Sequence, residues 1–210
     1  MLHKTPAPTA PSRPWLRQLA LLACGLLLTA HAHAHTEGSG ASGFLAGYLH
    51  PLSGVDHLLA MVAVGMWGAA LGRPLIWALP VVFPLLMVVG GVLGIAGVPL
   101  PFIEAGIAVS VLVLGLAIAL AWRAPLALAL AIVALFGVLH GHAHGTELPQ
   151  ATSPEAYAAG FVVSTGILHL SGIALGLLQR LPSGALALRG GGALIAAVGG
   201  YLLVSQAGLV

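Results

Sequence analysis

The chain has 210 residues, of which 59% are hydrophobic and only 6% are charged. Because a water-soluble domain carries about 25% charged residues, this composition excludes a soluble globular protein and predicts an integral membrane protein. Seven Lys and Arg residues against five Asp and Glu give a formal net charge of +2. The basic residues are scattered singly, which excludes a nucleic-acid-binding surface. The single cysteine, Cys24, provides neither a disulfide framework nor a thiolate metal cage.

Residues 1–34 have the pattern of a cleavable secretory signal peptide. Three basic residues come before the apolar run LALLACGLLLTA, and the following AHAHA supplies small residues for cleavage after Ala32 or Ala34. An uncleaved membrane anchor is the alternative, although the apolar run is short for a membrane span. We therefore expect a mature domain over residues 35–210.

Six apolar segments follow the predicted signal, and each has a length that suits a transmembrane helix of about 20 residues. Glycine and proline mark most of the boundaries between the segments. The predicted spans are residues 44–71, 74–95, 102–122, 125–140, 156–178 and 186–206. The 29 glycines of the chain predict close helix packing within the bilayer. The expected fold is an all-α integral membrane protein with six transmembrane helices.

The arginines of the mature chain predict its orientation. Arg73, Arg123, Arg180 and Arg189 all fall on one side of the six predicted spans, and the positive-inside rule makes that side cytoplasmic. The mature N-terminus and the C-terminus are then both outside, which agrees with a cleaved signal peptide.

The first group of polar residues lies in HPLSGVDHLLAM, residues 50–61. Pro51 suits a first helical position, which would put His50 at the outer end of the first span, with Asp56 and His57 in the next turns. A charged residue inside a bilayer costs about 2.5 to 3.5 kcal/mol, so Asp56 needs a partner. Carboxylate and neutral imidazole are ligands for borderline divalent metals. The alternative is that Asp56 hydrogen-bonds a histidine and only stabilises helix packing.

The second group is HGHAHGTE, in which His140, His142 and His144 alternate with small residues and Glu147 follows. All three imidazoles lie together only if the chain leaves the helix at the glycines, whereas a continuous helix puts only His140 and His144 on one face. Both arrangements bring at least two imidazoles to the outer end of the fourth predicted span. A solvated histidine loop is the alternative.

Two further residues are candidate metal ligands. Glu104 opens the third predicted span, where the helix dipole favours a carboxylate, so both a structural and a metal-binding role are open. His169 lies about 18 Å along the fifth predicted span, close to mid-membrane. The alternative for His169 is a core histidine that hydrogen-bonds Ser164, Thr165 or Ser171.

The expected mature N-terminus adds two histidines. If cleavage follows Ala32, the chain begins His33-Ala34-His35, and the free amine, two backbone amides and the imidazole of His35 can form a square-planar site for Ni(II) or Cu(II). Cleavage after Ala34 leaves only the amine and the imidazole of His35.

Four motifs, HPLSGVDHLLAM, PFIEAGIAVSVLVLG, HGHAHGTELP and GFVVSTGILHLSG, resemble the HupE/UreJ family of bacterial membrane proteins. The resemblance covers essentially the whole mature chain and includes the signal peptide. It implies a nickel or cobalt permease of the bacterial inner membrane, linked to hydrogenase or urease maturation. It also implies that the metal-handling positions are His50, Asp56, His57, Glu104, His140, His144 and His169.

The predicted function is therefore a secondary permease that imports nickel, or cobalt, from the periplasm. The ion is the transported substrate, so we expect no cofactor and no enzymatic activity. The chain has no G-x-x-x-x-G-K-[ST] motif, which excludes ATP hydrolysis through a P-loop. The expected partners are the lipid bilayer, the metal ion and nickel-enzyme maturation proteins. The alternative is a membrane metalloprotein, either a metal-dependent enzyme or a sensor, that binds the ion without moving it.

Overall fold

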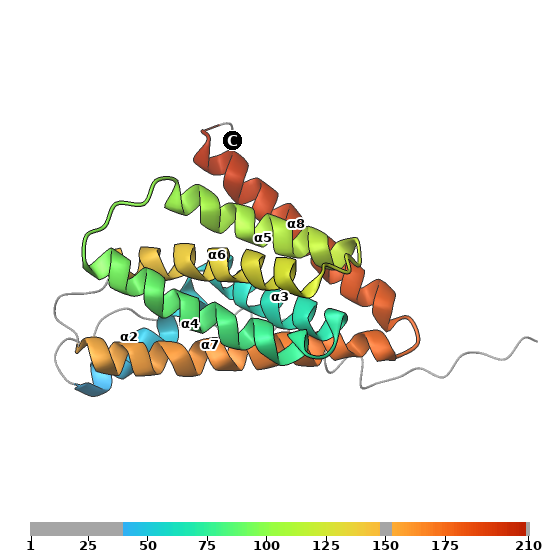
Figure 1. The fold of residues 1–210 in the computed structure, drawn as a ribbon, viewed down its shortest axis with the longest axis horizontal. Helices are drawn as coiled ribbons and strands as arrows, with labels where there is room; N and C mark the ends of the chain where they lie inside the picture. The colour runs from blue at the N-terminus through green and yellow to red at the C-terminus, as the bar shows by residue number, and fades with distance from the viewer. Residues whose placement is uncertain (1–39, 148–152, 209–210) are drawn as a thin grey trace, which may run out of the picture. The chain divides into compact units, whose positions relative to one another are not determined.

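The computed structural model describes residues 40–147 and 153–208, and within these ranges it contains helices and no strand (Figure 1). The elements in chain order are α2 (Gly40–Ser53), α3 (Val55–Leu71), α4 (Leu75–Ile95), α5 (Ile103–Ala119), α6 (Leu126–Thr146), α7 (Pro154–Leu177), the 3₁₀ helix η1 (Leu178–Arg180) and α8 (Gly184–Gln206). The all-α prediction is confirmed for this part of the chain. The predicted signal peptide lies outside the described residues.

Four helices, α4, α6, α7 with η1, and α8, are long and apolar enough to cross a membrane. The pair α2 and α3 forms a fifth candidate span, although the two helices meet at an angle of 81°. Helix α5 is apolar but has 17 residues, or about 26 Å, which is shorter than a hydrocarbon core of about 30 Å. The chain is therefore a multi-pass membrane protein, and six spans with both termini outside stay a prediction.

The segment predicted as one continuous first span is broken at Gly54. This residue has extended backbone angles (φ −94°, ψ 118°), so α2 ends before it and α3 begins after it. A Cβ atom on Gly54 would lie 2.8 Å from Oδ1 of Asp56 and 3.0 Å from Nδ1 of His57, which explains why glycine fits here. Pro51 lies near the end of α2 and not at a first helical position as predicted. The break brings the end of α2 and the start of α3 to the same place.

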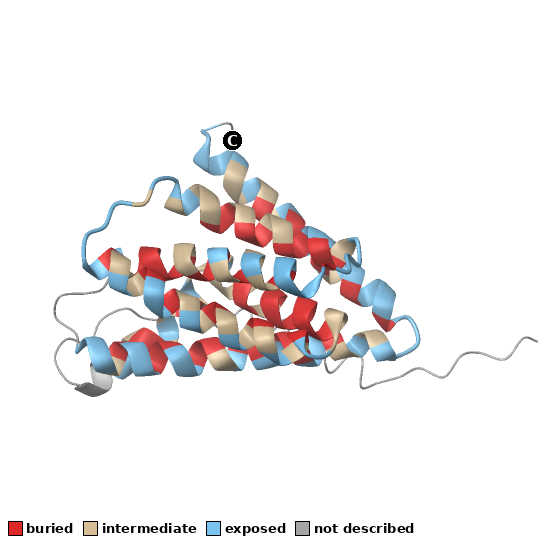
Figure 2. Cartoon of the chain, viewed as in Figure 1, coloured by how far each residue is buried: buried red, intermediate tan, exposed pale blue. Residues whose placement is uncertain are grey.

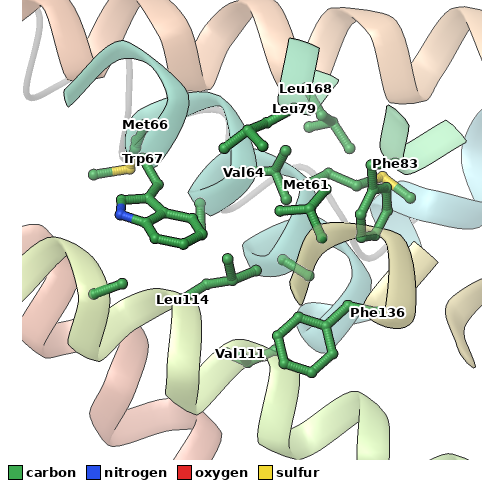
Figure 3. Packing of buried hydrophobic residues seen from close by; sticks show 14 of the residues in the cluster. Met61, Val64, Met66, Trp67, Leu79, Phe83, Val111, Leu114, Phe136 and Leu168 are labelled. Carbon is green, nitrogen blue, oxygen red and sulfur yellow. The ribbon is translucent and has the colours of Figure 1, made fainter. Parts of the chain in front are cut away.

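Helix α3 lies at the centre of the fold and packs against α4, α5 and α7. Its side chains Met61, Val64 and Trp67 are almost completely buried, and Figure 3 shows them facing Phe83 of α4 and Leu114 of α5. Figure 2 shows that buried positions follow the inward faces of the helices, while the outer faces are exposed. The exposed faces are rich in Val and Leu, as expected of surfaces that contact lipid.

Glycines let the backbones of paired helices approach closely. A Cβ atom on Gly90 of α4 would lie 2.0 Å from the carbonyl oxygen of Val138 of α6, and one on Gly141 of α6 would lie 2.0 Å from that of Met87 of α4. Such distances exclude any side chain at either glycine, which confirms the predicted role of glycine in packing. Helix α6 therefore has a fixed rotation against α4, and this rotation decides where its histidines point.

Candidate metal site

Four histidines from three helices meet where α2 gives way to α3. His50 lies in the last turn of α2, His57 in the first turn of α3, and His140 and His144 one turn apart near the end of α6. The ring centres are 4.7 Å apart for His50 and His144, 4.4 Å for His57 and His144, and 4.9 Å for His57 and His140. These four side chains form one continuous group, which we call the histidine cluster.

Asp56 fixes the orientation of His57. Its Oδ1 accepts a hydrogen bond from the backbone N–H of His57 (2.7 Å) and lies 2.7 Å from Nδ1 of the same residue. Because an ionised carboxylate can only accept, Nδ1 of His57 carries the proton and donates it. The lone pair of the neutral ring is then on Nε2, which is buried and has no hydrogen-bond partner among the described residues. Metal-ligating histidines are commonly supported by a carboxylate in this way.

Ser110 of α5 orients His140 by the same logic. The Ser110 hydroxyl donates to the carbonyl of Ile107 (2.6 Å), so its oxygen accepts the N–H at Nε2 of His140 (2.8 Å). The lone pair of His140 is therefore on Nδ1, which is buried and unpartnered within the described part of the chain. His57 Nε2 and His140 Nδ1 are thus two available metal-ligating atoms on neighbouring rings.

His50, His144 and Glu147 form the more exposed side of the site. One ligand atom from each lies within 4.8 Å of the others, an arrangement that can hold a metal ion. The side chain of Glu147 is 57% exposed and that of His50 is 29% exposed, whereas His144 is only 6% exposed. Neither ring nitrogen of His144 has a hydrogen-bond partner among the described residues. The site therefore runs from an exposed carboxylate to a buried imidazole.

Aromatic side chains surround the buried part of the histidine cluster. The ring centre of Phe161 of α7 is 4.5 Å from that of His144, and the ring centre of Phe83 of α4 is 5.4 Å from that of His140. Such rings exclude water, and in a medium of low dielectric constant the attraction between a cation and its ligands is stronger than in water.

His169 of α7 contacts Phe83 and is not part of the histidine cluster in the described chain. The ring centre of Phe83 is 5.6 Å from that of His169, and His169 has no ring contact with a histidine of the cluster among the described residues. Phe83 therefore contacts both His140 and His169.

The hydroxyl partners that the sequence suggested for His169 are not found, and within the described residues the hydroxyls of Ser164 and Thr165 are buried without a partner. Ser171 donates instead to a backbone carbonyl of its own helix. The ring of His169 lies beside the backbone carbonyl of Pro80 in α4, so a buried, hydrogen-bonded histidine stays an alternative to a metal ligand. His169 is thus a buried polar group, and its role as a metal ligand stays a prediction.

Comparison with known proteins places this arrangement in a family. The sequence model described as HupE / UreJ protein matches residues 21–202. The chain is 45% identical to Protein HupE of Rhizobium leguminosarum bv. viciae over 179 residues, which cover 85% of this chain and 93% of that protein. The chain belongs to the HupE/UreJ family. No solved structure matches this HupE/UreJ protein.

Helix α6 of this HupE/UreJ protein continues through all three histidines to Thr146. Of the two arrangements predicted for HGHAHG, the continuous helix is therefore the one found, and only His140 and His144 join the cluster. His142 points elsewhere, with Nε2 donating to the carbonyl of Val98 (2.7 Å) in the connection between α4 and α5. The buried position of His140 and His144 also differs from the solvated loop that was the alternative.

Three other predicted ligands are not part of the cluster as the structure describes it. Glu104 is exposed in the first turn of α5, and its side chain makes no ion pair within the described residues. His33 and His35 lie outside the described residues. Of the predicted set, the structure thus brings together five residues: His50, Asp56, His57, His140 and His144.

Sequence reasoning missed three side chains around the site, namely Ser110, Phe83 and Phe161. Ser110 was detectable in principle, because it is a single hydroxyl in the otherwise apolar run IAVSVLVLG. The two phenylalanines carry no such signal, since in a membrane protein an aromatic residue facing lipid and one facing a site look the same in sequence.

Proposed function

We propose that this HupE/UreJ protein is a secondary permease that imports nickel or cobalt from the periplasm to the cytoplasm of a bacterium. The observation that carries the proposal is the histidine cluster, because three of its four histidines have buried ring nitrogens without a partner in the described chain. A buried polar atom without a partner costs about 1–3 kcal/mol, and a bound cation removes that cost. Imidazole suits divalent transition metals of this class.

The proposed route begins at Glu147, which is exposed, and His50, which is partly exposed. Glu104 adds negative charge at the same end of the bundle, and the N-terminal His33 and His35 would add capture ligands. His142 keeps a free Nδ1 and is proposed as a further ligand from the other face of α6.

The inner part of the proposed route begins at His57, which Asp56 supports, and at His140. It then passes Phe83 and ends at His169. A broken helix whose ends meet at the site is the arrangement that transporters use to form ion sites near mid-membrane. Transport also requires that each site release its ion, which a site with few protein ligands and some water allows. We propose that movement of Phe83 opens the step to His169, and that the released nickel serves hydrogenase or urease maturation.

A second candidate function is a resident metal centre in an enzyme or a sensor. The observation that favours it is the convergence of four imidazoles within one group, where the sequence predicted ligands spread in depth. Such a centre would keep a stoichiometric metal ion through purification and would not move it across a membrane.

The test is accumulation of radioactive nickel or cobalt in proteoliposomes. The permease proposal expects time-dependent accumulation that His57→Ala and His169→Ala abolish, with zinc and copper as competing ions to define selectivity. Binding of the metal to the purified protein without any accumulation would overturn the permease and support the resident centre. Glu155→Gln is the matched control, because Glu155 is an exposed carboxylate that hydrogen-bonds only Ser153 among the described side chains.

A further inference from the structure

Charge is divided between the two ends of the bundle. The four arginines of the described chain lie where α3, α5 and α7 end and where α4, α6 and α8 begin, at positions 73, 123, 180 and 189. The described carboxylates lie toward the opposite helix ends, at positions 56, 104, 147 and 155. Both ion pairs within the described residues join a histidine to a carboxylate at the histidine end. The arginine end thus has positive charge that no carboxylate of the described chain neutralises.

A small cavity lies at this arginine end, where α3, α5, η1 and α8 meet. It has a volume of about 60 Å³; its lining is mainly apolar, and its polar residues are Arg123, Arg189 and Gln179. Trp67 and Trp122, whose rings stack with centres 5.8 Å apart, form an apolar wall. Since one water needs about 10–15 Å³ on a comparable measure, the cavity has room for a few waters or one small anion.

Three side chains that line the cavity donate hydrogen bonds to backbone carbonyls. Arg189 Nε donates to the carbonyl of Ala119 at the end of α5 (2.8 Å), which leaves the two terminal amino groups of the guanidinium for another acceptor. Gln179 donates to the carbonyl of Ala69 (3.0 Å), and the indole N–H of Trp67 donates to the carbonyl of Trp122 (3.2 Å). Three hydrogen bonds therefore hold the cavity, and Arg123 and Arg189 are exposed beside it.

We propose that this cavity binds a phosphate group at the end of the bundle opposite the histidine cluster. Two guanidinium groups without a carboxylate partner match a phosphate, because each can donate two parallel hydrogen bonds to its oxygens. The two arginines would repel a divalent cation, so the cavity is not a metal site. Two sources supply this chemistry, namely the headgroup of an anionic phospholipid and free phosphate.

The surroundings of the cavity favour the lipid headgroup. The neighbouring side chains Leu120 and Leu186 are 69% and 73% exposed, and Trp122 is 40% exposed. Exposed leucine and tryptophan beside a cationic cavity provide contacts for acyl chains and for the membrane interface. Basic pockets between transmembrane helices bind anionic headgroups in this manner.

The proposal is tested by measuring phosphatidylglycerol binding to the full chain by native mass spectrometry, with inorganic phosphate in a parallel arm. The double variant Arg123→Gln/Arg189→Gln should bind phosphatidylglycerol about 30-fold more weakly, because each basic residue near an anionic surface contributes about fivefold. The matched control is Arg73→Gln/Arg180→Gln, which removes the same charge from the same end but not from the cavity. This control loses the same surface charge, so it should bind more tightly than the cavity variant by the contribution of the direct contacts in the cavity.

Free phosphate is the source if the two double variants differ in their affinity for inorganic phosphate but not in their affinity for phosphatidylglycerol. The proposal is overturned if neither arm separates them, since any binding would then depend on net charge and not on the cavity. A folded double variant is recognised by unchanged nickel binding at the histidine end. If it does not fold, Arg123→Lys/Arg189→Lys replaces it, because lysine keeps the charge but loses the two-pronged contact and should weaken binding measurably.

Discussion

At the scale of single residues, two hydrogen bonds decide which nitrogen of an imidazole faces the site. A neutral histidine has one N–H donor and one lone pair, and only the lone pair binds a metal. His57 directs its donor to Asp56, and His140 directs its donor to Ser110. Both rings therefore keep the lone pair on the nitrogen without a partner in the described structure, and the two supporting groups decide which ring atom is available to a ligand.

Replacement of Ser110 by alanine should weaken nickel binding by about tenfold, at the lower end of the range for groups that support metal ligands. The change removes the acceptor that keeps the proton of His140 on Nε2, so the ring is free to expose either nitrogen. The affinity of the purified variant is measured by isothermal titration calorimetry. Ser171→Ala is the control, because Ser171 also hydrogen-bonds a carbonyl of its own helix but is exposed and away from the cluster. Equal affinities for the two variants would contradict the role of Ser110.

Replacement of Asp56 by asparagine should lower the affinity further, by roughly 10- to 100-fold. Asparagine keeps the size of the side chain and one carbonyl oxygen but removes the negative charge that supports His57 and attracts the cation. The same calorimetric titration measures the effect. Glu155→Gln removes one negative charge from an exposed position, and an equal loss in this control would mean that only net charge matters.

At this scale the sequence predicted which polar side chains lie together better than it predicted the groups that orient them. His50, Asp56 and His140 stand out because polar side chains are rare in a membrane protein and their burial has to be explained. The partner of His140 lies thirty positions away in sequence, on α5, and no local pattern links the two residues. The ring of Phe83 likewise becomes part of the site only through the packing of α4.

At the scale of helices, glycine sets the position of α6 and therefore of the cluster. Gly141 lies between His140 and His142, and a Cβ atom there would lie 2.0 Å from the carbonyl oxygen of Met87. Gly91 faces the same interface from α4, but a Cβ atom there would lie 3.5 Å from the nearest atom, which is an ordinary contact. Alanine at Gly141 would collide with the backbone of α4, whereas alanine at Gly91 would not collide with α6. Comparing the two substitutions therefore separates the effect of the collision from the effect of replacing a glycine in a helix.

Gly141→Ala should destabilise the protein by at least the 1–3 kcal/mol typical of overpacking, and it should reduce nickel uptake because the cluster is displaced. Gly91→Ala should leave both properties close to those of the unchanged protein. Thermal unfolding in detergent and uptake into proteoliposomes are the two measurements. A Gly141→Ala variant with unchanged uptake would show that the cluster does not depend on the contact between α4 and α6.

Most of the helices were predictable from the sequence, whereas the break at Gly54 was not. The predicted spans 74–95, 125–140 and 156–178 correspond to α4, α6 and α7, because a long apolar run between glycines and prolines has few other solutions in a bilayer. Gly54 has extended backbone angles that the apolar run around it does not signal, and the side chains of Asp56 and His57 fill the space that a side chain there would need. The continuation of α6 through its histidines is fixed by its packing against α4.

At the scale of the whole molecule, the division of charge suits one-way movement of a cation. Carboxylates and the histidine cluster lie at one end of the bundle, and the described arginines lie at the other. The positive-inside rule assigns the arginine end to the cytoplasm, so in the proposed orientation the ligands face the compartment that supplies the metal. The chain has no P-loop motif, and we propose the membrane potential as the driving force.

Nickel accumulation in proteoliposomes should therefore depend steeply on the membrane potential. A doubly charged ion gains about 4.6 kcal/mol per 100 mV when it moves toward a negative interior, which corresponds to a concentration ratio of roughly three orders of magnitude. A potassium gradient with valinomycin sets the potential, and accumulation should rise with an interior-negative potential and cease when the potential is collapsed. His57→Ala vesicles at the same potential control for leakage. Accumulation that is unchanged over a range of 100 mV would mean that the ion is exchanged for equal charge, and it would contradict a potential-driven permease.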